Sequence, residues 1–213
     1  MSVSQADSGL KYDATVTPAV KAQMEDDIVF INSINGAKTT PLYSQIFGKM
    51  DGAVLTNWLL SRVKAVGYEE RNDGAVAYVM LLMPWKMWLT QNFVQFSHPA
   101  IARLMIVYHE ARHTEIKSGG NPHATCPTPF KDEKGNDMKS IWTGRLLQGE
   151  PACDISPFGS YGSSTILLKN VAMNCDSCSE KVKMDADIYA SDQIGRVTDA
   201  NAKEQMKKDF GVQ

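Results

Sequence analysis

The residues of this sequence that can do chemistry lie close together in the segment His109-Glu110-Ala111-Arg112-His113. On a helix, residues four positions apart share one face and lie about 5 to 6 Å apart, so two imidazoles can bind one tetrahedral metal ion. The carboxylate of Glu110 follows the first histidine, where it can reach a metal-bound water without binding the metal. The spacing therefore predicts a metal site with His109 and His113 as ligands and Glu110 as a general base.

This segment falls within a predicted helix from Ala100 to about Lys117, in which apolar residues recur at helical spacing. His98 stands at the start of the helix, where we expect it to act as a capping residue, and the glycine- and proline-containing run at residues 119–122 ends it. Arg112 and Glu115 flank the histidines and are expected to form a solvent-exposed salt bridge, with orientation of the second nitrogen of a ligand as the alternative.

A catalytic metal also needs a third protein ligand and an open position. The first candidate is His123, because the turn at residues 120–122 could swing its imidazole back to the metal. The alternatives are Asp154, a glutamate at Glu133 or Glu150, and no third ligand at all.

These residues resemble the zincin class of zinc metallopeptidases, whose signature is H-E-x-x-H. The later histidine is similar to the metzincin pattern H-E-x-x-H-x-x-G-x-x-H with four extra residues. Met173 is either the counterpart of the metzincin methionine turn or, as we expect, an ordinary core methionine. Asp154 followed by Tyr161 looks more loosely like the aspzincin, or deuterolysin, arrangement. The resemblance implies a Zn²⁺ cofactor, catalysis by Glu110, and a hydrogen bond from Tyr161 to the developing oxyanion. Tyr161 could equally anchor the turn at residues 159–162.

The four cysteines all lie in the second half of the chain, at Cys126, Cys153, Cys175 and Cys178. We expect disulfides between Cys126 and Cys153 and between Cys175 and Cys178, as in proteins of oxidising compartments. Free or redox-active thiols and a four-thiolate zinc site are the alternatives, although a four-thiolate site needs two close pairs. We therefore expect a secreted or periplasmic protein, although no signal peptide is present in the sequence as given.

Composition limits the other function classes. Hydrophobic residues make up 43% of the 213 residues, charged residues 22%, and the formal net charge is −2. A nucleic-acid partner is not expected from this charge, and no apolar run is long enough for a membrane span. We expect a flexible lead-in at residues 1–16, followed by a single monomeric domain at residues 17–213.

The pattern predicts an α+β fold, and the resemblance implies that it is zincin-like: a small mixed sheet packed on helices, a long active-site helix, and a disulfide-bearing, loop-rich C-terminal half. The stretch that follows the last helix is expected to be a charged tail. The further helices are expected at Thr17 to Asn35, Asp51 to Val66 with Gly67 ending it, Ser163 to Met173 and Ser179 to Asp192. The strands are expected at Ala75 to Met83 and Met87 to Phe96, separated at Pro84.

What the resemblance implies for function is hydrolysis of peptide bonds in a peptide or protein substrate, as in a small exported bacterial protease. The strand Met87 to Phe96 would then be the sheet edge along which an extended substrate lies. Two alternatives stay open: a zinc amidase acting on cell-wall peptide, and a non-catalytic, disulfide-stapled protein that binds metal.

Overall fold

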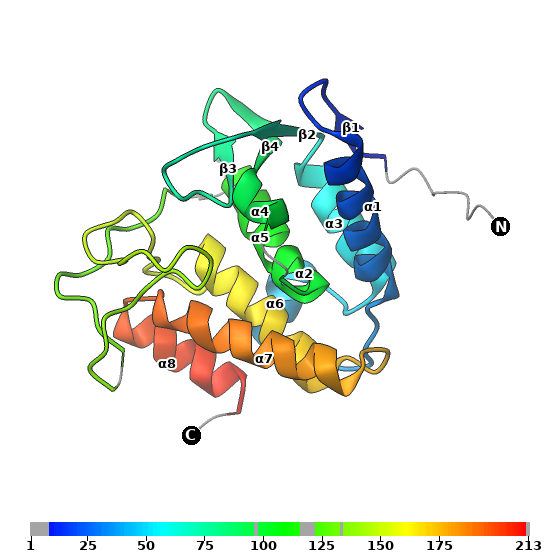
Figure 1. Ribbon diagram of the computed structural model, residues 1–213. Helices are drawn as coiled ribbons and strands as arrows, with labels where there is room; N and C mark the ends of the chain where they lie inside the picture. Colours follow the sequence, from blue (N-terminus) through cyan, green and yellow to red (C-terminus); the bar gives the residue numbers. More distant parts are fainter. Residues whose placement is uncertain (1–8, 96–97, 116–121, 133, 212–213) are drawn as a thin grey trace.

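The computed structural model describes residues 9–95, 98–115, 122–132 and 134–211, which contain eight α-helices and one four-stranded sheet (Figure 1). The helices are α1 (Pro18–Ser33), α2 (Pro41–Phe47), α3 (Gly52–Arg62), α4 (Gln91–Gln95), α5 (Ala100–His113), α6 (Ser160–Asn174), α7 (Glu180–Gly195) and α8 (Ala200–Asp209). The strands are β1 (Lys11–Tyr12), β2 (Ala65–Glu69), β3 (Ala77–Met80) and β4 (Met83–Thr90). The α+β class with a small mixed sheet is confirmed.

Three of the longer helices were predicted well. The hydroxyl of Thr17 accepts a hydrogen bond from the backbone N–H of Val20 at 3.3 Å, and α1 begins at the next residue, Pro18. Ser179 caps α7 in the same way. The predicted helix from Ser163 is also confirmed as α6, which begins slightly earlier, at Ser160.

The second helix is shorter than predicted, because residues 65–69 form strand β2. α3 ends at Arg62, and Gly67, predicted to end the helix, lies within the strand. A Cβ atom at Gly67 would lie 2.7 Å from the ring of Trp88 on the neighbouring strand β4. A glycine at this position therefore leaves room for the Trp88 ring to pack closely against the backbone. This contact between strands cannot be recognised from the local sequence pattern.

The two predicted strands exist, but their boundary was placed wrongly. Pro84 does not separate them: it lies inside β4, and the chain turns earlier, between Met80 and Met83. Pro84 is tolerated because β3 pairs with β4 at Met83 and again only from Met87, across an irregularity in the register. After Thr90 the chain forms α4, so the predicted strand ends there; Phe96 lies outside the described residues.

The sheet order is β1-β2-β4-β3, with β1, β2 and β4 parallel and β3 antiparallel to β4. The strand predicted as the substrate edge, β4, is therefore interior. β3 is an edge strand, and β1, formed by Lys11–Tyr12 of the predicted lead-in, is the other edge.

Besides α4, two short helices were not predicted. The charged stretch expected to be a C-terminal tail forms α8, which buries Ala202 and Met206 and is capped by Asp199. α2 begins at Pro41 after its cap, Thr40. Helices this short contain too few apolar residues to show a helical periodicity. Their capping residues were the only indication of a helix in the sequence.

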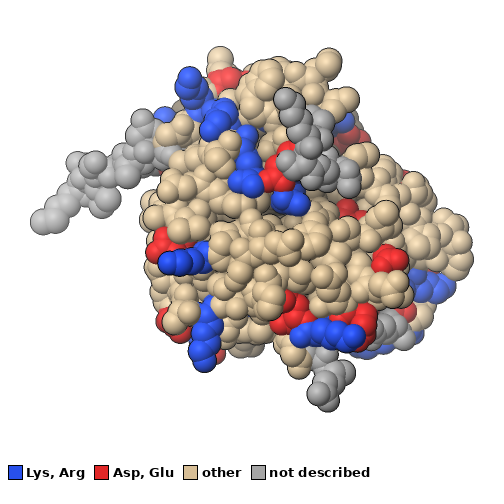
Figure 2. All heavy atoms as spheres, turned by 180° about the vertical axis from the view of Figure 1, so that it is seen from behind, with Lys and Arg blue, Asp and Glu red and all other residues tan. Residues whose placement is uncertain are grey.

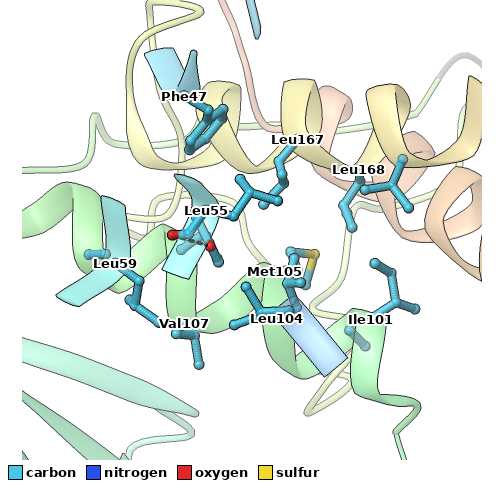
Figure 3. Packing of buried hydrophobic residues seen from close by; sticks show 14 of the residues in the cluster. Phe47, Leu55, Leu59, Ile101, Leu104, Met105, Val107, Leu167 and Leu168 are labelled. Atoms are coloured by element: carbon cyan, nitrogen blue, oxygen red, sulfur yellow. Dashed lines mark hydrogen bonds between the residues drawn. The ribbon is translucent and has the colours of Figure 1, made fainter. Parts of the chain in front are cut away.

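The core is built around α5, which lies between the sheet and the pair α6 and α7 (Figure 1). Figure 3 shows side chains of α3, α5 and α6 pointing toward one another, among them Leu55, Leu104 and Leu167, all fully buried. Burying a leucine contributes about 1.5 to 3 kcal/mol. Arg103 of α5 also donates two hydrogen bonds of 2.8 Å to the buried carboxylate of Asp27 on α1. The helix that carries the predicted site is thus fixed on several sides.

Both predicted disulfides are confirmed, Cys126–Cys153 and Cys175–Cys178. The alternatives of free thiols and of a four-thiolate zinc site are therefore wrong. Among the described residues, no helix is long and apolar enough to cross a bilayer. On the face shown in Figure 2, acidic and basic side chains are interspersed among uncharged residues, in keeping with the small net charge.

Replacing Cys126 and Cys153 together by serine should lower the free energy of unfolding by about 3 to 4 kcal/mol, because their bond closes a loop with a sequence separation of 27. The matched control, serine at both Cys175 and Cys178, removes a bond with a separation of 3 and should cost less. Denaturant unfolding without reductant measures both losses. An equal loss in the two double variants would contradict this account.

Candidate metal centre

Helix α5 presents the three residues of the predicted motif at its C-terminal end. His109 and Glu110 are buried and His113 is half-buried. The helix ends at His113, with Thr114 as its C-cap, which is earlier than the predicted Lys117; that residue lies outside the described part of the chain. The core packing of α5 therefore holds the two imidazoles on one face.

His123 comes to the same place from the loop after α5. The Nε2 atom of His123 lies 3.1 Å from Nε2 of His109 and 3.1 Å from Nε2 of His113, and the last two atoms are 3.3 Å apart. Among the described residues, these three histidines are the group whose ligand atoms could hold a metal ion. Most of the turn predicted to bring His123 back lies outside the described residues.

The three nitrogens cannot all be satisfied by hydrogen bonds with one another. Each Nε2 atom is either a donor or an acceptor, and in a triangle at least one pair must then present two lone pairs or two N–H groups. A cation bound by all three lone pairs removes this conflict. For metal–nitrogen bonds of about 2.0 to 2.1 Å, two ligands of a tetrahedron lie about 3.3 to 3.4 Å apart, close to the separations found here.

Asp154 fixes the orientation of His123. Its Oδ1 atom lies 3.1 Å from Nδ1 of His123, so the imidazole donates its Nδ1 proton to the carboxylate and turns the Nε2 lone pair toward the other histidines. The Oδ2 atom accepts the backbone N–H groups of Tyr161 at 2.7 Å and Gly162 at 3.3 Å, at the start of α6. Asp154, considered as a third ligand from the sequence, thus lies behind His123.

The backbone around Asp154 is clamped as well. Its N–H donates to the carbonyl of Arg196 at 2.9 Å, and its carbonyl accepts from the N–H of Thr198 at 2.7 Å. Cys153, the preceding residue, is held by its disulfide. A Cβ atom at Gly159 would collide with the carboxylate of Asp154, so this position needs a glycine.

Tyr161, for which the sequence left two roles open, lies against the histidines. Its ring centroid is 4.4 Å from that of His109 and 4.6 Å from that of His123. Its hydroxyl oxygen accepts a hydrogen bond of 2.8 Å from Nη1 of Arg196, which leaves the phenolic proton free to be donated elsewhere. Burial raises the pKa of Tyr161, against the opposing effect of Arg196, so the phenol keeps its proton at neutral pH.

Arg196 was not found from the sequence. It is the C-cap residue of α7 and reaches the site only through the fold, so no motif or spacing connects it to the histidines. Its guanidinium also lies over the ring of Tyr161, 4.7 Å from the centroid. The position of Tyr161 is thus set jointly by α6 and by the end of α7.

Burial shifts the pKa values of His109 and Glu110, the first two residues of the motif. It raises the pKa of Glu110 to about 8 and, with the neighbouring histidines, lowers the pKa of His109 well below its ordinary value. His109 is therefore neutral, as a metal ligand must be. A bound cation would favour the ionised form of Glu110 and lower its pKa again.

Two of the lesser predictions near the site are wrong, and a third is correct only in part. Pro99, and not His98, is the N-cap residue of α5, and the Nδ1 atom of His98 lies 2.7 Å from the hydroxyl of Tyr189. Met173 lies within α6 and is 46% exposed, so it forms no turn beneath the histidines. Arg112 and Glu115 do form an ion pair, but both side chains are largely buried and Glu115 is shared with Arg62.

The histidines His109 and His123 line a cleft of about 620 Å³, together with Glu110 and Tyr161. This volume is typical of ligand sites. The opposite walls come from residues 73–77, which lead into β3, and from several residues between 140 and 152. Glu150, another candidate ligand, lines this cleft but lies outside the histidine group, and Glu133 lies outside the described residues.

No protein-family model, curated protein or solved structure matches this chain when it is compared with known proteins. The likeness to zincins therefore rests on the segment from His109 to His113 and on the positions of His123 and Tyr161. Neither a metal ion nor a reaction is assigned by similarity, so both must follow from the geometry of the site.

Replacing Asp154 by asparagine should weaken metal binding by about 10- to 100-fold, because His123 loses the charged acceptor that orients it. Competition with a chelating dye measures the affinity, and circular dichroism shows whether the variant is folded. Asp137→Asn is the matched control, since this carboxylate pairs with a lysine at the exposed surface. Equal affinities in the two variants would rule out the role given to Asp154.

Proposed function

We propose that this protein is a zinc-dependent peptidase of the zincin type. The observation that carries the proposal is the convergence of three imidazole Nε2 atoms, 3.1 to 3.3 Å apart. Two of these histidines, His109 and His123, line a cleft together with the buried carboxylate of Glu110. Three neutral imidazoles with one open position are a common ligand set of catalytic zinc. A site for Ca²⁺ or Mg²⁺ would instead be lined with oxygen ligands.

The metal, when bound, would polarise a substrate carbonyl and lower the pKa of water toward about 7. In this proposal Glu110 accepts the proton of the attacking water and later returns it to the leaving amine. Its burial beside His109 on the wall of the cleft supports this role. Tyr161 donates its phenolic proton to the oxygen of the carbonyl under attack, a role supported by the hydrogen bond that its hydroxyl oxygen accepts from Arg196.

The sheet supports a peptide as the substrate. Residues 73–77 line the cleft and lead into the edge strand β3, whose second side is not paired with another described strand. An extended peptide could add to this edge by backbone hydrogen bonds. The two disulfides are consistent with an oxidising environment and support secretion or a periplasmic location.

The amidase alternative receives no particular support from the charges of the cleft. A basic cleft would favour it, whereas the acidic residues Asp73, Glu110 and Glu150 line the cleft together with Arg145 and Arg196. The mixed charges are compatible with ordinary peptides.

The test of the proposal is Glu110→Gln, assayed on a mixed peptide library with the zinc content of each preparation measured. Cleavage should fall by about 10²- to 10⁴-fold while one zinc per chain is retained, because only the proton acceptor is lost. Glu150→Gln removes another carboxylate of the same cleft and should leave cleavage nearly unchanged. Full activity in Glu110→Gln, or no cleavage by the zinc-containing native protein, would refute the proposal.

A further inference from the structure

Arg196 is a buried cation on the wall of the cleft, with a relative exposure of 5%. Its backbone is fixed by the end of α7 and by the hydrogen bond from Asp154. Its guanidinium lies beside Tyr161, which in turn contacts the ring of His109. The positive charge is thus one side chain away from the histidine group.

The hydrogen-bonding capacity of this guanidinium is largely unused. Of its five N–H donors, one is donated to the hydroxyl of Tyr161 at 2.8 Å. The carboxylate of Asp192 is 3.9 Å from Nη2, too far for a hydrogen bond, and Nε is buried without a partner among the described residues. Trp142, also on the wall of the cleft, has a buried indole N–H that likewise meets no acceptor in the part of the chain that the structure describes.

An arginine cannot lose its charge by deprotonation, so burial without a close anion is costly. Asp192 and the C-terminal end of α7 offset part of this charge. A planar carboxylate that reaches the guanidinium from the cleft would supply the missing acceptors, because the two groups match in bidentate geometry.

We propose that Arg196 binds a carboxylate of the substrate, so that the cleft selects peptides with a free carboxylate next to the scissile bond. This inference rests on the proposed peptidase function. Since one residue spans only about 3.3 to 3.6 Å of extended chain, the carboxylate belongs to a residue beside the bond that faces the histidines. It can be the C-terminal carboxylate of the peptide or an aspartate or glutamate side chain.

Arg145, the other arginine of the cleft, is a matched control. It is exposed, and its guanidinium donates to the backbone carbonyls of Asn72 and Asp73. Its removal changes the net charge of the cleft by the same amount as the removal of Arg196. Only Arg196 combines burial with unused donors.

The first experiment measures binding rather than turnover. The full-length protein is titrated in a calorimeter with benzoylglycine and with its uncharged amide, and benzoylglycine should bind about 10- to 100-fold more tightly. Arg196→Gln should remove this preference, whereas Arg145→Gln should keep it. Equal binding of the two probes by the native protein overturns the proposal without any variant, and so does an unchanged preference in folded Arg196→Gln.

The second experiment identifies the source of the carboxylate. Cleavage is compared between peptides with free and amidated C-termini, and between internal sequences that carry glutamate or glutamine beside the scissile bond. A preference of about 10-fold or more for either carboxylate, lost in Arg196→Gln, supports the proposal and names the source; no preference in either pair overturns it. If benzoylglycine binds through Arg196 but no peptide is cleaved, the carboxylate site stands and the peptidase function fails.

Discussion

Three imidazole nitrogens lie within 3.3 Å of one another, and they cannot satisfy each other by hydrogen bonds alone. Bringing them together without a shared cation costs free energy, because at least one pair must repel. The surrounding structure holds the arrangement in spite of this cost. At functional sites, unfavourable local interactions of this kind are often held in place by the rest of the fold. Here a bound metal ion would remove the repulsion between the Nε2 atoms.

The support comes from two separate parts of the molecule. His109 and His113 belong to α5, whose opposite face is fixed by the apolar core and by the pair of Arg103 with Asp27. His123 belongs to a loop and depends on Asp154, which is held by the start of α6, by backbone bonds after α7 and by the adjacent disulfide. The site is therefore assembled between the core helix and the cross-linked half of the chain.

What could be predicted from the sequence was local. The pair of histidines four residues apart, the cap at Thr17 and the cysteine pairs each depend on short-range geometry, and the structure agrees with the arrangement expected for them. The predictions based on Gly67 and Pro84 were wrong because these residues, which usually end helices or strands, lie within strands of the sheet. Arg196 could not be found at all, since only the tertiary fold brings it to the cleft.

The most direct test is a crystal structure of the zinc-loaded protein with anomalous scattering measured on both sides of the zinc absorption edge. The account predicts one strong peak in the cleft, bonded to the Nε2 atoms of His109, His113 and His123, with Asp154 still hydrogen-bonded to His123. A peak elsewhere, or an imidazole of His123 turned away from the other two, would contradict it.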